Sequence, residues 1–185
     1  MKILLVANNP LDAQVVEQSL THDGHAVAIC NDQHGGPCRG VAQLEACPLE
    51  SSVDLAVIAR SSETRRGLGE MGSVCAARHR VGVVEIDPDE PLSGPRLYDL
   101  ADEAERHICR DYEATVDATL REVVGPEQPF SVAVRRHGRD VHVTLTLNYP
   151  ASVLERVAVA DRARAGVRRH DRFSQVIDVS VLQRG

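Results

Sequence analysis

Short apolar runs alternate with amphipathic segments through the first half of the chain, and this alternation restricts the possible folds most. The runs cover residues 2–7, 25–30, 53–59 and 81–86. They carry no polar face, which is typical of strands in a parallel sheet that helices cover on both sides. Helices are expected over 11–21 and 68–79, where apolar residues fall at helical spacing. The first half is therefore predicted to be an α/β layer structure with a parallel sheet and flanking helices.

The second half has a different order of elements. A helix is expected over 97–124, because its apolar residues recur every three or four positions, and Gly125 and Pro126 end it. Two alternating segments then surround the turn His137-Gly138-Arg139, which predicts an antiparallel hairpin. These hairpin strands, the next helix and the last strand are expected over residues 130–136, 140–148, 153–170 and 175–182. The order predicts a smaller α+β domain of the αββαβ type.

Two segments interrupt the regular pattern. Residues 87–95 are rich in proline and are interpreted as the boundary between a domain over 1–93 and a domain over 94–185. Residues 30–52 form a long connection in which only 41–46 could form one short helix. So long a connection without regular structure is uncommon in a compact domain, so something else must order it.

Composition excludes several classes of function. The net charge is -6, so no general attraction to nucleic acid or to an anionic membrane is expected. Aromatic residues make up only 3% of the chain, too few for a platform that stacks on bases. No run approaches the roughly 18 apolar residues of a membrane span. We therefore expect a cytoplasmic protein that is not inserted in a membrane.

The five cysteines carry the clearest chemical signal. In a reducing cytoplasm a disulfide framework is not expected. Four of them surround or follow the long connection and could together hold zinc or an iron–sulfur cluster: Cys30, Cys38, Cys47 and Cys75. No C-x-x-C motif is present, and inert thiols buried in a core are the alternative. His34 could replace one cysteine as a ligand, whereas Cys109 is interpreted as a structural thiol.

The first 90 residues resemble the receiver domain of response regulators, a flavodoxin-like fold. The resemblance rests on Ile3-Leu4-Leu5-Val6 before a polar turn, and on Asp54-Leu55-Ala56-Val57-Ile58-Ala59. Receivers hold magnesium with an acidic pair after the first strand, where this chain has Asn8 and Asn9. Ala59 replaces the phosphoacceptor aspartate, and Lys2 is the only lysine. The resemblance thus implies the fold without phosphorelay chemistry.

The first expected strand is not followed by the glycine motif of a dinucleotide site. No G-x-G-x-x-G follows the first strand, and no Walker A loop, G-x-S-x-G elbow or H-E-x-x-H occurs. We therefore expect no NAD, FMN or ATP site. Asp87, Asp89 and Glu90 crowd the end of the fourth expected strand, where a cation could bind, but a polar linker is favoured.

The second half resembles the small αββαβ domains of the alkaline-shock, envelope-stress family and is also similar to BON domains. The residues that carry this resemblance are Val141–Asn148, Tyr149-Pro150 and Val176–Val181. It implies a module for binding or oligomerisation. The many arginines around the hairpin tip could form an anion-binding patch, but a solvated face paired with local acids is favoured.

The apolar stripe of the long helix predicts self-association. It runs from Leu97 to Val123, which is longer than one small domain needs. Either its two halves pack on the two domains, or part of it contacts a second copy of the chain. We expect a homodimer with Ile108 or Tyr112 at or near the contact.

These observations predict a non-enzymatic regulatory protein. A receiver-like domain that cannot accept phosphate carries a cysteine-ligated metal or iron–sulfur site, and the αββαβ domain transmits its state to an unidentified protein partner or a second copy. The first alternative is an interaction or scaffold protein without a cofactor. The second is a thiol redox enzyme, which is disfavoured because no base or anion-binding loop accompanies a cysteine.

Overall fold

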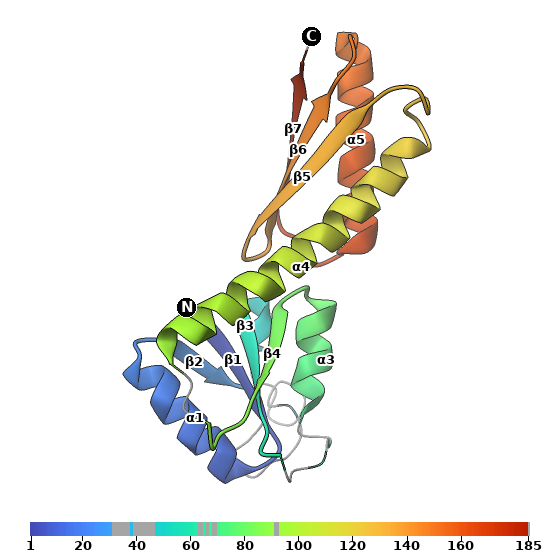
Figure 1. The fold of residues 1–185 in the computed structure, drawn as a ribbon. Helices are drawn as coiled ribbons and strands as arrows, with labels where there is room; N and C mark the ends of the chain where they lie inside the picture. The colour runs from blue at the N-terminus through green and yellow to red at the C-terminus, as the bar shows by residue number, and fades with distance from the viewer. Residues whose placement is uncertain are drawn as a thin grey trace. The chain divides into compact units, whose positions relative to one another are not determined.

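The chain forms two compact units, which we call unit 1 (Met1–Glu105) and unit 2 (Arg106–Gly185). The computed structural model (Figure 1) describes residues 1–30, 38, 47–62, 65, 67, 70–90 and 93–184. The units divide inside helix α4 (Gly94–Arg121), whereas the sequence places the domain boundary just before this helix. The short helix expected over 41–46 lies outside the described residues.

Unit 1 is built on a parallel sheet, as the apolar runs predict. Its strands are β1 (Lys2–Ala7), β2 (Ala26–Ile29), β3 (Leu55–Ala59) and β4 (Gly82–Ile86). Their order in the sheet is β2-β1-β3-β4, and every pair is parallel. From β1 the chain passes first to one side of the sheet and then to the other. The carboxyl ends of β1 and β3 therefore flank the switch point, where ligands bind in open α/β sheets.

Helices cover both faces of this sheet. Helix α1 (Pro10–His22) and the first turns of α4 pack on one face, in a core that includes Leu5, Val57 and Leu97. The short 3-10 helix η1 (Pro48–Glu50) and helix α3 (Met71–Arg78) lie on the other face. Because successive strand residues point to opposite faces, two buried faces require strands that are apolar throughout.

Unit 2 is a two-layer α+β structure with the predicted αββαβ order. Its strands are β5 (Phe130–His137), β6 (Asp140–Leu147) and β7 (Ile177–Gln183), arranged in the order β5-β6-β7. The hairpin β5–β6 is antiparallel, and β7 pairs parallel with β6, so the sheet is mixed. Helix α5 (Val153–His170) begins with a capping box formed by Ser152 and Glu155. It packs on the sheet together with the second half of α4.

The apolar stripe of α4 is used within the chain. Leu97 and its neighbours pack in unit 1, and Val116 and Leu120 are fully buried in unit 2. Tyr112, which the sequence places near a dimer contact, is 0% exposed and donates a 2.6 Å hydrogen bond from its hydroxyl to Asp171. Tyr112 is therefore not itself a surface residue for such a contact, because the core of unit 2 encloses the side chain. The homodimer with Ile108 or Tyr112 at or near the contact stays a prediction; Val123, at the end of the stripe, is 54% exposed.

Among the described residues, no helix combines the length and the apolar composition that crossing a membrane requires.

Candidate functional site

Cys30 is fixed at the carboxyl end of strand β2. Its backbone N–H donates a 3.0 Å hydrogen bond to the carbonyl of Leu5, which extends the pairing of β2 with β1 by one residue. The side chain is 3% exposed and belongs to the apolar core on the face of the sheet that α3 and η1 cover. The strand expected over 25–30 ends at this residue. The backbone hydrogen bond from Cys30 to β1 holds the thiol in a defined position.

Helix α3 contacts the sulfur of Cys30 directly. A Cβ atom added at Gly72 would lie 2.6 Å from the Sγ of Cys30 and 2.9 Å from the Cγ2 of Val6, so only glycine allows this approach. Cys75 is three residues further along the same helix, and residues at this spacing share a helix face. The Cys75 thiol therefore lies on the side of α3 that faces Cys30, and it packs against the same core.

Cys47 and Cys38 are the other two predicted metal ligands. Cys47 immediately precedes η1, where its carbonyl accepts a 2.9 Å hydrogen bond from the N–H of Glu50. Leu49, which is 2% exposed, anchors this turn in the core. Cys38 is partly buried, and both Cys38 and Cys47 pack against the core that contains Cys30. The structure thus brings the four predicted cysteines to one face of one sheet.

The thiols influence one another electrostatically. The pKa of Cys30 is raised to about 12, first by burial and then by the nearby thiols Cys38, Cys47 and Cys75 and a side-chain hydrogen bond to Cys38. Burial also raises the pKa of Cys47 above its ordinary value, partly opposed by a backbone hydrogen bond at Leu49. Four thiolates crowded in this way repel one another, and a bound cation removes the repulsion.

The sulfur atoms are neighbours without forming a finished coordination shell. In the part of the chain that the structure describes, no three His, Cys, Asp or Glu side chains stand at metal-ligating positions. Zinc holds thiolate sulfurs about 2.3 Å away, so binding requires these side chains to turn toward a common centre. His34, the substitute ligand suggested by the sequence, lies outside the described residues. Cys109 belongs to unit 2 and is not part of the cluster.

The carboxyl edge of the sheet in unit 1 holds a second polar cluster, which the sequence did not indicate. Arg60 follows β3, and its Nε and Nη2 donate to the two carboxylate oxygens of Glu70, the Nε at 2.9 Å. The Nδ2 of Asn8, which follows β1, donates to the same carboxylate at 2.9 Å. Arg60 also donates to Glu85 at 2.7 Å. These contacts raise the pKa of Arg60, chiefly through the hydrogen bond to Glu70.

This ion pair lies at the carboxyl ends of β1 and β3, where it contacts Asn8. Arg60 and Glu70 are 11% and 7% exposed, so the pair is largely shielded from water. An added anion would compete with Glu70 for Arg60, and an added cation would compete with Arg60 for Glu70. Either ion would first have to break the buried pair, which is unfavourable. The charges of Arg60 and Glu70 at this edge therefore balance each other.

The acidic residues after β4 form a turn, in agreement with the favoured interpretation of a polar linker. The carboxylate of Asp87 accepts a hydrogen bond from the N–H of Asp89 at 3.0 Å. Glu90 donates its N–H to the carbonyl of Asp87 and makes a long surface ion pair with Arg96 at 3.5 Å. The carboxylates of Asp87 and Glu90 are thus used by the loop and by a surface arginine.

Many of the arginines of unit 2 have partners inside the unit. Arg139 and Arg168 donate to backbone carbonyls of the loop before β7. Arg162 and Arg164 make surface ion pairs with Glu122 and Asp161. These contacts favour the solvated, locally paired face over a concentrated anion-binding patch.

Comparisons with known proteins add little to this picture. No protein-family model matches the chain, and no curated protein matches it. Among solved structures, the chain is similar to an imine reductase from Streptomyces aurantiacus, with 14% sequence identity and a TM-score of 0.29. The similarity covers 98% of this chain and 56% of the reductase, so the chain spans little more than half the length of that protein. At this TM-score the likeness carries no argument about fold or function.

Proposed function

We propose that this chain is a non-enzymatic regulatory protein of the cytoplasm whose four clustered cysteines hold zinc or an iron–sulfur cluster. One observation carries the proposal. Cys30, Cys38, Cys47 and Cys75 come from four different places in the sequence, and all four pack against the same apolar core on one face of the sheet. Thiolates are the ligands that zinc and iron–sulfur clusters prefer, and four complete either site.

A metal would attach the long connection to the regular structure of unit 1. Cys38 lies within this connection and Cys47 near its end, while Cys30 and Cys75 belong to the sheet edge and to α3. Metal bound by all four would tie the connection to regular structure on both sides, so the binding free energy would contribute to folding. Reduced thiols persist in the cytoplasm, which suits this chemistry.

The receiver-like part of the proposal rests on the strand order and on the ion pair at the carboxyl edge of the sheet. The order β2-β1-β3-β4 is that of the first four strands in the flavodoxin-like class. At the edge where such folds bind ligands, Arg60 and Glu70 neutralise each other. Asn8 donates to this pair, and Ala59 offers no acceptor oxygen. These features support a domain that senses through its thiols rather than through phosphate.

The same geometry weighs against a thiol enzyme. A nucleophilic cysteine needs a lowered pKa, because the thiolate is the reactive form. The pKa of Cys30 is instead raised to about 12, mainly by burial, and burial also raises that of Cys47. At neutral pH these thiols are protonated until a metal displaces the proton. A scaffold protein without a cofactor stays the alternative that the experiment must exclude.

The test is the metal content of protein purified without oxygen. We expect stoichiometric zinc in a colourless protein, or iron and sulfide in a brown one. Cys38→Ser should lose the metal and make residues 30–52 sensitive to protease, because the connection then lacks its anchor. Cys109→Ser is the matched control, since this thiol lies in the other unit and should not change metal content. Metal-free wild-type protein, or full retention of metal in Cys38→Ser, would reject the proposal and leave the scaffold alternative.

A further inference from the structure

The edge strands of the sheet in unit 2 are β5 and β7. They differ in whether a side chain hydrogen-bonds to their outward-facing backbone groups. At the β5 edge, the carboxylate of Glu113 on α4 accepts a 3.0 Å hydrogen bond from the N–H of Val134. The N–H of Val134 is therefore already hydrogen-bonded to a helix side chain and cannot donate to another strand. Such blocking is a common protection of sheet edges against pairing with another chain.

The β7 edge lacks this protection. In the described part of the chain β6 is the only strand that pairs with β7. The carbonyl of Val176 and the N–H of Arg184 bond to β6, which places the even-numbered backbone groups of the strand toward β6. By the alternation of a β ladder, Ile177, Val179, Val181 and Gln183 direct their N–H and C=O groups outward. The strand carries no lysine or proline to discourage pairing.

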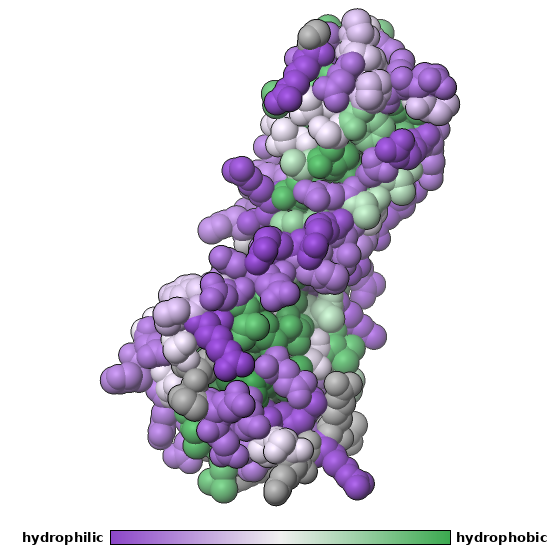
Figure 2. Space-filling view, in the orientation of Figure 1, coloured by the Kyte–Doolittle hydropathy of each residue, from purple (hydrophilic) through white to green (hydrophobic). Residues whose placement is uncertain are grey.

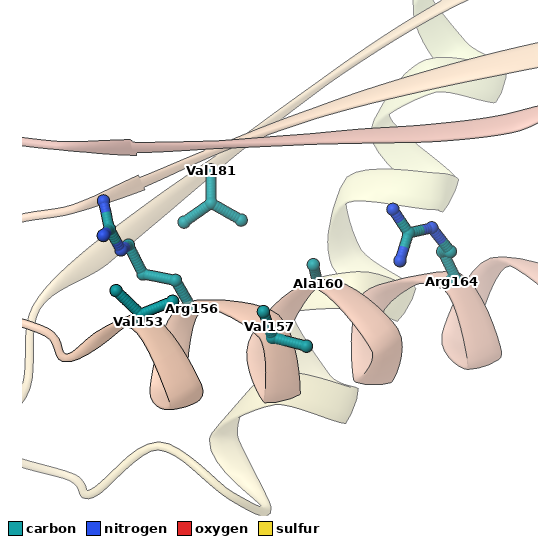
Figure 3. Close-up of a pocket in the computed structure, with 6 residues that line it drawn as sticks. All are labelled: Val153, Arg156, Val157, Ala160, Arg164 and Val181. Atoms are coloured by element: carbon teal, nitrogen blue, oxygen red, sulfur yellow. The ribbon is translucent and has the colours of Figure 1, made fainter.

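A groove runs beside this open edge, between β7 and α5. It has a volume of about 340 Å³ and is lined by Val153, Arg156, Val157, Ala160, Arg164 and Val181. In Figure 3, Val181 points from the strand toward the helix, and the two arginines project on either side of the apolar residues. The groove therefore has an apolar floor and a basic group toward each end.

The apolar wall of the groove is exposed to a degree that needs an explanation. Apolar residues reach the surface of both units among polar ones (Figure 2). On α5, Val153 is 65% exposed, the adjacent Leu154 is 82% exposed and Val157 is 54% exposed. Three such residues in the first turns of one helix, next to an open strand edge, form a patch typical of interaction surfaces.

The charges around the groove select its occupant. None of the six residues that line it is acidic. Arg164 donates to Asp161 at 2.7 Å, but both side chains are well exposed, so this pair is weak and easily exchanged. A second copy related by a two-fold axis would bring the same arginines toward each other, which is unfavourable. An acidic and apolar segment from another protein meets no such repulsion.

We propose that unit 2 binds an extended segment of a partner protein, which adds to the sheet as a fourth strand beside β7. The segment places apolar side chains in the groove and carboxylates against Arg156 and Arg164. These arginines are eight residues apart on α5, which corresponds to about 12 Å along the helix. Two acidic residues four positions apart in a strand are about 13 Å apart and point to the same side. Backbone pairing supplies affinity, and the groove supplies specificity.

This inference names the kind of partner that the proposed regulatory function needs, but it depends on unit 2 alone. Its test does not involve the thiols, so either proposal can fail without the other. The probe is a capped nonapeptide with the sequence Val-Thr-Glu-Thr-Val-Thr-Glu-Thr-Val. Its odd positions carry the valines and glutamates that face the helix, and its even positions carry threonine.

Binding is followed by NMR chemical-shift changes in the full chain. We expect changes confined to β7 and to residues 153–164, with at least about tenfold weaker binding to the variant that combines Arg156→Glu with Arg164→Glu. Val157→Glu should also abolish binding, and since Val157 is 54% exposed, this variant should stay folded. Arg135→Glu, a change on the solvated face of β5, is the matched control and should bind normally.

Three results would overturn the inference. The first is equal binding of a peptide with lysine in place of glutamate, which would remove the role of the arginines. The second is the absence of any shift in β7 at millimolar peptide. The third is a wild-type dimer that Val157→Glu converts to a monomer, because the groove would then be occupied by a second copy.

Discussion

Replacement of Glu70 should cost unit 1 far more stability than replacement of Glu85, although both carboxylates bind the same arginine. Glu70 is 7% exposed and accepts hydrogen bonds from Arg60 and from Asn8. Glu85 is 48% exposed and accepts a single hydrogen bond from Arg60. The two variants therefore compare the loss of a buried partner of Arg60 with the loss of an exposed partner of the same arginine.

The expected magnitudes follow from burial. Glu70→Ala leaves the guanidinium of Arg60, which is 11% exposed, without its main counter-charge. Removing one partner of a fully buried ion pair costs about 3–5 kcal/mol, and because Glu85 still pairs with Arg60, the loss should lie at the lower end of that range. Glu85→Ala removes an exposed partner and should cost about 0–1 kcal/mol. Helix capping does not complicate the comparison, because the side chain of Glu70 makes no capping hydrogen bond to α3.

Urea unfolding measures the difference in stability between Glu70→Ala and Glu85→Ala. The two units could unfold separately, so a single transition cannot be assumed. Amide hydrogen exchange of β1 and β3 reports on unit 1 alone, and these amides should exchange much faster in Glu70→Ala than in Glu85→Ala. A double variant that combines Arg60→Met with Glu70→Leu should recover much of the loss, since no unpaired charge stays buried. Equal effects of Glu70→Ala and Glu85→Ala would refute the interpretation of a buried pair.

Two further predictions concern the thiol cluster. Gly72→Ala should destabilise unit 1 by about 1–3 kcal/mol, because the new methyl group meets the Cys30 sulfur at 2.6 Å, and adding Cys30→Ala should relieve part of this cost. Additive losses in urea unfolding would contradict the close contact. The raised pKa of Cys30, about 12 against an ordinary value of 9.0, means that the unfolded chain releases this proton first as the pH rises. Metal-free wild-type protein should therefore lose stability relative to Cys30→Ser between pH 9 and pH 12, and a constant difference across that range would show that the thiol is not buried.

Much of the fold follows from the spacing of apolar residues. Strand β1 covers residues 2–7 as predicted, because every position after Lys2 is apolar and buried. Helix α4 begins at Gly94, earlier than the sequence suggests. The sequence interpretation placed Pro95 in a linker, whereas a proline fits the first turn of a helix, where no N–H partner is needed. The mixed α/β architecture with a second αββαβ unit is confirmed.

The thiol cluster could be anticipated only in part. Cysteines at the end of a strand, in a long connection and on the following helix point to one region of an α/β sheet, and the structure places them on a common core. The close approach at Gly72 was not foreseeable, because it depends on where α3 crosses the end of β2. The same holds for the Arg60–Glu70 pair, in which two loop residues meet through tertiary packing and no motif records them.

The Glu113 contact with Val134 shows the same limit in unit 2. Glu113 belongs to no motif and to none of the apolar positions of the long helix. Its role at the β5 edge emerges only when the hairpin is packed against α4. Side-chain bonds to the backbone of a distant strand leave no periodic signal in the sequence.

An X-ray absorption spectrum at the metal edge, taken on protein purified without oxygen, tests the central claim most directly. If Cys30, Cys38, Cys47 and Cys75 are ligands, the first shell contains four sulfur atoms about 2.3 Å from zinc or iron. The same shell should be present in Cys109→Ser. A protein without stoichiometric metal, or a first shell of nitrogen and oxygen alone, would contradict the account.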